Sequence, residues 1–174
     1  MKKNVPLLLI AVLAIYLGGC KKSTVTGPPD FSKITVTDSV GLYTGAVDST
    51  DWTYDETWTA EELAFMNFTD TFALTDTVGG FVQVSALYPN PNHGIFSLLT
   101  TVEKECKMKV AIVNTSMHLI SYNTFKFLGG PVATGFNCTV STAFHPNENY
   151  RIYYGFYNAK GTLFYKGHGD FRIE

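Results

Sequence analysis

The chain lacks most patterns that mark catalytic, metal-binding or nucleic-acid-binding proteins. Its 174 residues include only four histidines and three cysteines, without an HxH, HExxH or CxxC spacing, so no local metal site is predicted. The GxSxG element of many hydrolases and a glycine-rich phosphate loop are also missing. Lysine and arginine number 13 against 15 acidic residues and form no cluster, which argues against nucleic acid as a partner. We therefore expect no enzyme activity, no cofactor and no metal.

A long apolar run is also missing. Residues 5–17 are almost wholly apolar, but a membrane-spanning helix needs about 20 such residues. The run follows Lys2 and Lys3, and the small pair Gly18-Gly19 ends it before Cys20, which is the layout of a secretory signal peptide. No A-x-A-like site precedes Cys20, so an ordinary cleaved signal that leaves a soluble protein is disfavoured.

The stretch Leu17-Gly18-Gly19-Cys20 resembles the lipobox of bacterial lipoproteins. The resemblance implies cleavage before Cys20 and attachment of diacylglyceryl and palmitate-type chains to it, and two or more acyl chains anchor a protein stably. We expect a signal peptide over 1–19 and a lipidated tether over 20–30. The expected location is the outer membrane, with the domain on its periplasmic or cell-surface face, and the membrane itself, an outer-membrane protein complex or a glycan as partners.

Short strand-like segments separated by turn residues occupy the second half of the chain. Alternating strand–helix units are absent, so a parallel sheet is not expected. The spacing predicts an all-β fold over 81–174, an antiparallel immunoglobulin-like sandwich of about seven strands. The predicted strands are 81–88, 95–102, 103–113, 119–127, 136–144, 150–157 and 162–166, before a last piece at 167–174.

Residues 31–80 form an N-terminal segment with one helix signal. Thr59 and Glu62 have the spacing of a capping box, and apolar residues then recur at helical intervals, which predicts a short helix over 60–68. Trp52 and Trp58 precede this helix. They are expected to pack the helix onto the sandwich, and the alternative is a tryptophan pair that binds a ligand.

The strand predicted over 150–157 is aromatic on both faces. Tyr153 and Tyr157 share one face with Arg151, and the opposite face is equally apolar. One interpretation is that the N-terminal segment, with Trp52 and Trp58, covers the first face. The other is an exposed aromatic patch that binds a carbohydrate or a peptide. The exposure of the two tyrosines distinguishes these interpretations.

Cys106 and Cys138 both alternate with apolar residues and are expected to face the core. An oxidising envelope permits a disulfide between them. The alternative is two separate buried thiols that act as small apolar side chains.

His168 and Asp170 lie between glycines at the end of the chain. A bulge in the final strand accounts for this pattern, with Asp170 accepting local amide bonds. A hydrolase would need these two side chains and a nucleophile in one pocket, and we favour the bulge.

The stretch from Ala86 to Leu98, ALYPNPNHGIFSL, resembles the opening of the C-terminal sorting domains of the type IX secretion pathway, which are seven-stranded sandwiches. Independently of the family, Pro89 and Pro91 must end a strand, and Gly94 can adopt a positive φ. The predicted result is a stiff corner that carries the chain from one sheet to the other. The chain ends DFRIE and lacks the basic and apolar final strand of such signals, so the likeness is interpreted as one of fold.

The combination of lipobox and sandwich resembles the small outer-membrane lipoproteins of Gram-negative bacteria. The resemblance implies a lipid-anchored protein of the outer membrane, and we expect it to be non-enzymatic, with a structural or protein-interaction role. The alternatives are a carbohydrate- or peptide-binding module that uses the aromatic face, and a type IX sorting domain.

Overall fold

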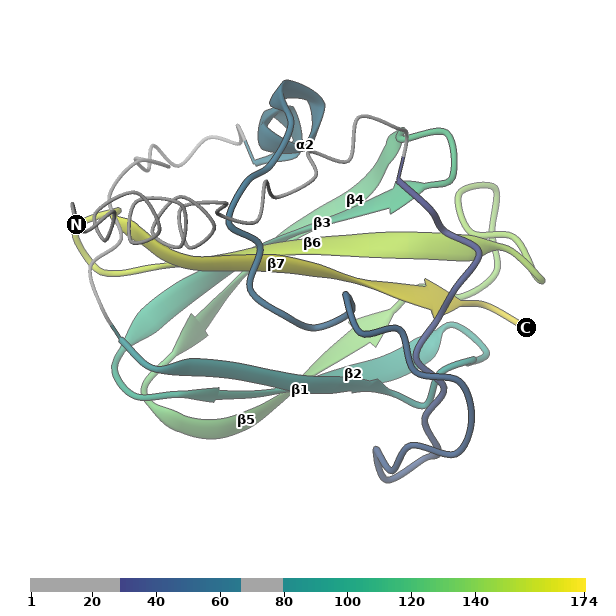
Figure 1. Cartoon of the computed structure of the whole chain (residues 1–174), viewed down its shortest axis with the longest axis horizontal. Helices are drawn as coiled ribbons and strands as arrows, with labels where there is room; N and C mark the ends of the chain where they lie inside the picture. The colour runs from purple at the N-terminus through teal and green to yellow at the C-terminus, as the bar shows by residue number, and fades with distance from the viewer. Residues whose placement is uncertain (1–28, 67–79) are drawn as a thin grey trace, which may run out of the picture.

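The protein is an all-β sandwich with a short helix on one outer face. A computed structural model describes residues 29–66 and 80–174, and Figure 1 shows two packed sheets with helix α2 above one of them. The expected immunoglobulin-like sandwich of about seven antiparallel strands is confirmed. Its elements are α2 Ala60–Phe65, β1 Val82–Tyr88, β2 Ile95–Val102, β3 Cys106–Asn114, β4 Leu119–Phe127, β5 Gly130–Asn137, β6 Asn149–Tyr157 and β7 Leu163–Arg172.

The two sheets have the strand orders β1-β2-β5 and β4-β3-β6-β7. Hairpins join β1 to β2, β3 to β4 and β6 to β7, and the other connections cross between the sheets. The fourth strand therefore pairs with the third strand and leaves β5 at the end of the three-stranded sheet. The predicted signal peptide and most of the tether, including Cys20, lie outside the described residues.

The core lies between the sheets because alternate side chains of each strand point inward. On β2, Phe96, Leu98 and Val102 are buried, whereas Ser97, Leu99 and Thr101 are half-buried and Ile95 is exposed. Phe96 contacts the rings of Phe136 and Phe171 at centroid distances of 5.2 and 4.7 Å. Side chains from both sheets therefore interlock in one cluster.

One predicted strand is wrong. The pattern favoured a strand over 136–144, whereas β5 spans Gly130–Asn137. The glycine pair followed by Pro131 indicates a turn in sequence, but a proline is tolerated near the start of an edge strand, where its missing N–H is not needed. Beyond Asn137 the chain turns, and the Ser141 N–H donates to the Phe144 carbonyl at 2.8 Å.

The corner after β1 ends the strand at Tyr88, as predicted, and both of its X-Pro bonds are cis. Gly94 has a φ of +86°, and a Cβ there would lie 2.6 Å from the Thr139 Cα. The predicted change of sheet is wrong, because Tyr88 pairs with Ser97 across a β1–β2 hairpin within one sheet.

The predicted bulge at 166–170 is also wrong. β7 is continuous there, with His168 opposite Tyr153 and Asp170 opposite Arg151, and the register shift lies near Tyr157. The glycines have a different role. A Cβ on Gly167 would collide with the Thr53 carbonyl, and one on Gly169 would collide with the Trp52 ring.

The N-terminal segment covers the outer edge of β7. The Trp52 N–H donates to the His168 carbonyl at 2.7 Å, and the Asp55 N–H donates to the Lys166 carbonyl at 2.9 Å. Further along, the Asn90 side chain donates to the Asp170 carbonyl at 3.0 Å and accepts from the Arg172 N–H at 3.1 Å. These bonds satisfy an edge that would otherwise be open to pairing with another chain.

Candidate functional site

The aromatic face of β6 is covered. Tyr153 and Tyr157 are 0% and 3% exposed, and Trp52 and Trp58 are 5% and 9% exposed. An exposed aromatic patch formed by these four residues is therefore wrong. Tyr153 lies in a second apolar cluster with Phe31, Trp58, Phe65 and Met66 of the N-terminal segment and with two β3 residues, Ala111 and Val113.

Helix α2 is attached to this face through its own cap. The predicted capping box is present: the Glu62 N–H donates to Thr59 Oγ1 at 3.2 Å, and the Thr59 N–H donates to Glu62 Oε2 at 2.7 Å. The other oxygen of Glu62 accepts from the Tyr153 hydroxyl at 2.9 Å. Burial raises the pKa of Tyr153, so the phenol stays a donor and connects the helix start to the sheet.

The two tryptophans have different positions. Trp58 makes an edge contact with Tyr153 at 5.6 Å, as expected for a residue that packs the helix onto the sandwich. Trp52 joins the main core instead and stacks on Tyr154 at 6.5 Å. Its φ of 58° is unusual for a residue with a side chain, and Gly169 provides the space for its ring.

His168 and Asp170 belong to separate pairs. His168 Nδ1 lies 2.7 Å from Asp55 Oδ2, and the same oxygen accepts from Trp58 Nε1 at 2.8 Å. Within the described ranges, the His168 ring has no hydrogen bond from a hydroxyl or a thiol. The constellation that a hydrolase would need from His168 and Asp170 is not formed, because each side chain is bonded to a different structural partner.

Asp170 forms a buried, bidentate pair with Arg151. Both nitrogen–oxygen distances are 2.7 Å, and the side chains are 7% and 0% exposed. Arg151 also donates to the Asp30 carbonyl at 3.0 Å, and its guanidinium lies 4.8 Å from the Phe31 ring centroid. Burial alone would lower the pKa of Arg151, but the Asp170 carboxylate outweighs it and raises the pKa. The pair therefore fastens the start of the described chain to β6 and β7.

A second buried carboxylate, Asp51, lies beside this pair. Its Oδ2 accepts from the Thr35 N–H at 2.9 Å and from the Thr35 hydroxyl at 2.8 Å. Its Oδ1 accepts from the Asp170 N–H at 2.8 Å. Burial, and next the nearby charge of Asp170, raises the pKa of Asp51 to about 6.

This carboxyl group predicts a protein that is more stable in mild acid. The pKa of Asp51 in the folded protein, about 6, lies above the ordinary value of 3.8. Between about pH 4 and pH 6 the folded chain therefore binds a proton at Asp51 that the unfolded chain does not bind. Asp51 alone should therefore raise the free energy of unfolding as pH falls from 7 to 4, by up to about 3 kcal/mol. Urea denaturation at a series of pH values measures it. An Asp51→Asn variant, which cannot titrate at this position, should lose the rise, and an equal rise in both proteins would contradict the assignment.

Cys106 and Cys138 are both buried, as predicted, and both are free thiols, so the disulfide considered from sequence is not formed. Cys106 begins β3, whereas Cys138 follows β5 and lies near Ile112 on the inner face of β3. Cys106 and Ile112 are six residues apart on β3, which corresponds to about 20 Å along the strand. A disulfide needs Cα atoms less than about 7 Å apart. Burial raises the pKa of Cys106 to about 11 and that of Cys138 to about 12, so both stay protonated.

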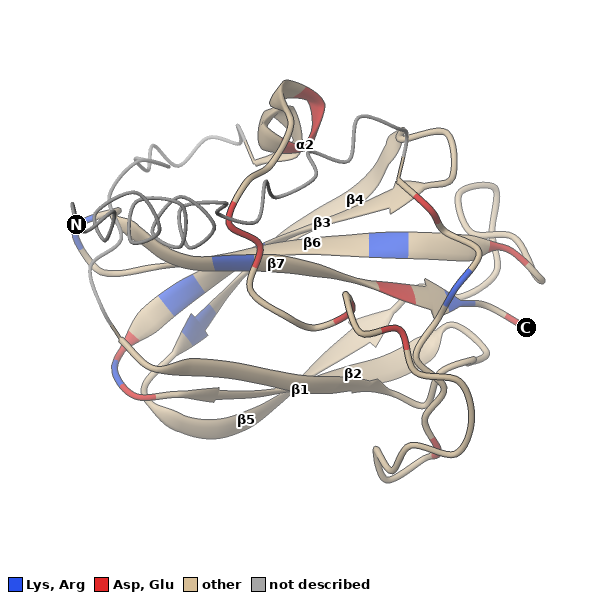
Figure 2. Cartoon of the chain, in the orientation of Figure 1, with Lys and Arg blue, Asp and Glu red and all other residues tan. Residues whose placement is uncertain are grey.

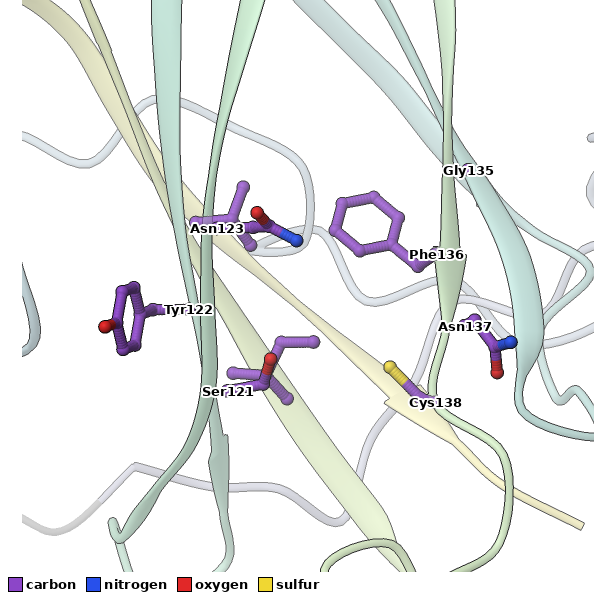
Figure 3. A pocket seen from close by; sticks show the side chains of 9 residues that line it. Ser121, Tyr122, Asn123, Gly135, Phe136, Asn137 and Cys138 are labelled. Carbon is purple, nitrogen blue, oxygen red and sulfur yellow. The ribbon is translucent and has the colours of Figure 1, made fainter.

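A cavity of about 190 Å³ opens between the edge strands β4 and β5. In Figure 3, Ser121 and Asn123 of β4 point toward Phe136 and Cys138 across the gap, and Tyr122 points away. Ser121 and Asn123 lie opposite Ile112 and Val110 of β3. These core-facing positions of β4 carry small polar side chains, so the sheets are not sealed at this edge.

The described residues hold no group of three or more side chains suited to a metal ion. In the same ranges, no helix is long and apolar enough to cross a membrane.

Sequence analysis did not identify the charged residues that attach the N-terminal segment to β6 and β7. Asp51, Asp55 and the Arg151–Asp170 pair were not predicted as a group. One signal was present, since Arg151 stands alone among the apolar residues of its strand. A charge in such a strand needs a partner of opposite sign.

No family model and no curated protein matches the sequence. Among solved structures, the sensor domain of the anti-sigma factor RsgI4 in Pseudobacteroides cellulosolvens is similar, with 13% identity and a TM-score of 0.36, over 55% of this chain and 89% of that chain. A β-glucuronidase from glycoside hydrolase family 2 is similar with 14% identity and a TM-score of 0.32, over 57% of this chain and 12% of the enzyme chain. These likenesses concern the fold alone. Neither protein is a type IX sorting domain, and that resemblance stays a prediction.

Proposed function

We propose that the protein is a lipid-anchored envelope lipoprotein whose sandwich has a structural or protein-contact role rather than a catalytic one. The observation that carries the proposal is the stretch Leu17-Gly18-Gly19-Cys20 behind a short apolar run, which has the layout of a lipoprotein signal. Acyl chains on Cys20 would hold the domain at the outer membrane, through a tether of about ten residues.

The environment of the candidate side chains supports a role without catalysis. Tyr153 and Trp58 pack together, His168 is bonded to Asp55, and Asp170 is bonded to Arg151. Each of these groups stabilises the contact between the N-terminal segment and the sandwich. An aromatic face that binds a glycan would need these rings in solvent, so the buried positions disfavour that alternative.

A Cys20→Ser variant tests the anchor. The full chain should move from the membrane fraction to the soluble fraction and lose incorporation of a palmitate analogue, because serine offers no thiol for the diacylglyceryl group. Lys21→Ser is the matched control and should stay lipidated, since it changes the next residue and leaves the lipobox intact. Sedimentation of Cys20→Ser with membranes at the level of the unmodified protein would refute the proposal.

A further inference from the structure

A short hairpin of the N-terminal segment, residues 36–46, lies at one end of the sandwich (Figure 1). Thr37 and Tyr43 pair across it. The Thr37 hydroxyl donates to the Leu87 carbonyl of β1 at 2.6 Å. The Tyr43 hydroxyl donates to the Ser85 carbonyl of the same strand at 3.1 Å. These bonds fix the hairpin on the outer edge of β1.

The hairpin tip, residues 39–42, presents two large apolar side chains. Val40 and Leu42 are 71% and 64% exposed. The stretch 39–47 contains no charged residue, and Figure 2 shows the tip without blue or red. The Asp38 carboxylate accepts from the N–H groups of Val40 and Leu42, both at 2.9 Å. The two side chains are therefore held out on a fixed turn rather than on a loose loop.

The hairpin tip lies at the end of the sandwich where the described chain begins. The Arg151 side chain, near the start of β6, donates to the Asp30 carbonyl, and Thr37 pairs with Asn90 in the corner after β1. The start of β6 and this corner are at the same end, because both adjoin Arg172 at the end of β7. Figure 1 shows the purple start of the described chain and the hairpin on the same side of the molecule.

The tether before this point is short compared with the sandwich. Ten residue steps separate Cys20 from Asp30, which corresponds to an average span of about 18 Å for a flexible chain. A folded domain of this size is about 40 Å across. With acyl chains on Cys20, the end of the sandwich that bears Asp30 and the hairpin tip is therefore held nearest the bilayer.

We propose that the hairpin tip inserts Val40 and Leu42 into the lipid surface beside the acyl anchor, so that the domain has one fixed orientation on the membrane. This inference rests on the proposed lipid anchor at Cys20. Apolar side chains gain free energy when they leave water, and the anchor keeps the tip at a high effective concentration near the bilayer, so a small contact suffices. A lipid surface is the occupant because the tether brings this end of the domain to the bilayer whether or not another protein is present.

A fluorescent label at the tip tests the contact in the full lipidated chain, reconstituted in vesicles of phosphatidylcholine. A Leu42→Cys variant takes an environment-sensitive thiol label at this position, because Cys106 and Cys138 are buried. On reconstitution the emission should shift to shorter wavelength. Spin-labelled lipid should quench it several times more strongly than it quenches a label at the opposite end of the sandwich.

Leu128→Cys is the matched control. Leu128 is also a leucine on the surface, 77% exposed. It follows β4, which ends beside the first residue of β3, away from the end at which β3 meets the start of β6. A label at this position should emit as it does in water, with and without vesicles.

A second substitution separates insertion from nearness to the bilayer. Val40→Asp places a charge next to the label on Leu42→Cys and should return its emission to the value in water, because a charge is costly in the apolar part of a membrane. Leu128→Asp, combined with the same label, adds the same charge at the opposite end and should leave the emission unchanged. Equal effects of the two substitutions would contradict insertion of the tip.

Incorporation of a palmitate analogue, measured on the same preparation, distinguishes failure of this inference from failure of the anchor. A chain without acyl groups would refute the lipoprotein proposal and the tip contact together. An acylated chain whose Leu42→Cys label is no better protected than the Leu128→Cys label would overturn the tip contact alone. Protection that arises in native membranes but not in pure lipid vesicles would also overturn it, and would assign the tip to a protein partner.

Discussion

Replacing Arg151 by methionine is expected to lower the free energy of unfolding by about 3–5 kcal/mol. The substitution keeps most of the side-chain volume but leaves the fully buried Asp170 carboxylate without its bidentate partner. It also removes the donor to the Asp30 carbonyl. Equilibrium denaturation in urea, followed by tryptophan fluorescence, measures the loss, and the two tryptophans lie in the segment that Arg151 helps to hold.

A double variant distinguishes an unpaired charge from a simple loss of packing. Arg151→Met combined with Asp170→Leu removes both charges and should be less destabilised than Arg151→Met alone, since apolar residues often replace a buried ion pair at little cost. If the free energy of unfolding of the double variant falls by the sum of the two single losses, the two side chains are not energetically coupled. That result would contradict the stabilising role of the Arg151–Asp170 pair.

Gly169→Ala is the second substitution with a large expected effect. The added methyl group would occupy the space of the Trp52 ring. The main-chain N–H of Trp52 donates to the His168 carbonyl and holds the residue at this place. We expect a loss of about 3 kcal/mol, because the ring must leave the core or distort β7. Local loosening of residues 51–55 should appear as faster amide hydrogen exchange of Trp52 and Asp55.

Gly135→Ala is the matched control for this substitution. It makes the same chemical change in an edge strand, where no described atom lies within 4 Å of the added methyl group. The free energy of unfolding should therefore be unchanged or raised by up to about 1 kcal/mol. Equal losses for the two glycines would mean that the contact with Trp52 is not the reason for Gly169.

The alternation of side chains predicted most of the fold. Strands 95–102 and 119–127 were placed with their observed ends, because period-2 patterns and flanking turn residues agree there. The strand at 136–144 was misplaced because local turn signals at Gly129, Gly130 and Pro131 indicate a break. The outer position of β5 in its sheet, which is a tertiary property, makes a proline acceptable at that point.

The site was harder to predict because it depends on long-range register. Counting back from the turn at 158–161 with Tyr157 opposite Leu163 would place Arg151 opposite Gly169. The register shift next to Tyr157 moves the pairing by one residue and brings Asp170 opposite Arg151. The glycines at 167 and 169 indicated a bulge in the strand itself, because no local pattern shows that Trp52 and Thr53 cross over them.

The bonds between the N-terminal segment and the last strand also constrain when the protein can fold. Asp51 and Asp170 are 119 residues apart in the chain, and Asp30 and Arg151 are 121 apart. The segment that is synthesised early can therefore reach its final position only after the C-terminal strand has emerged. Contacts of such sequence separation slow folding, so the closure of the N-terminal segment over β6 and β7 is expected to be a late step, and the outer face of β6 stays open to solvent until then.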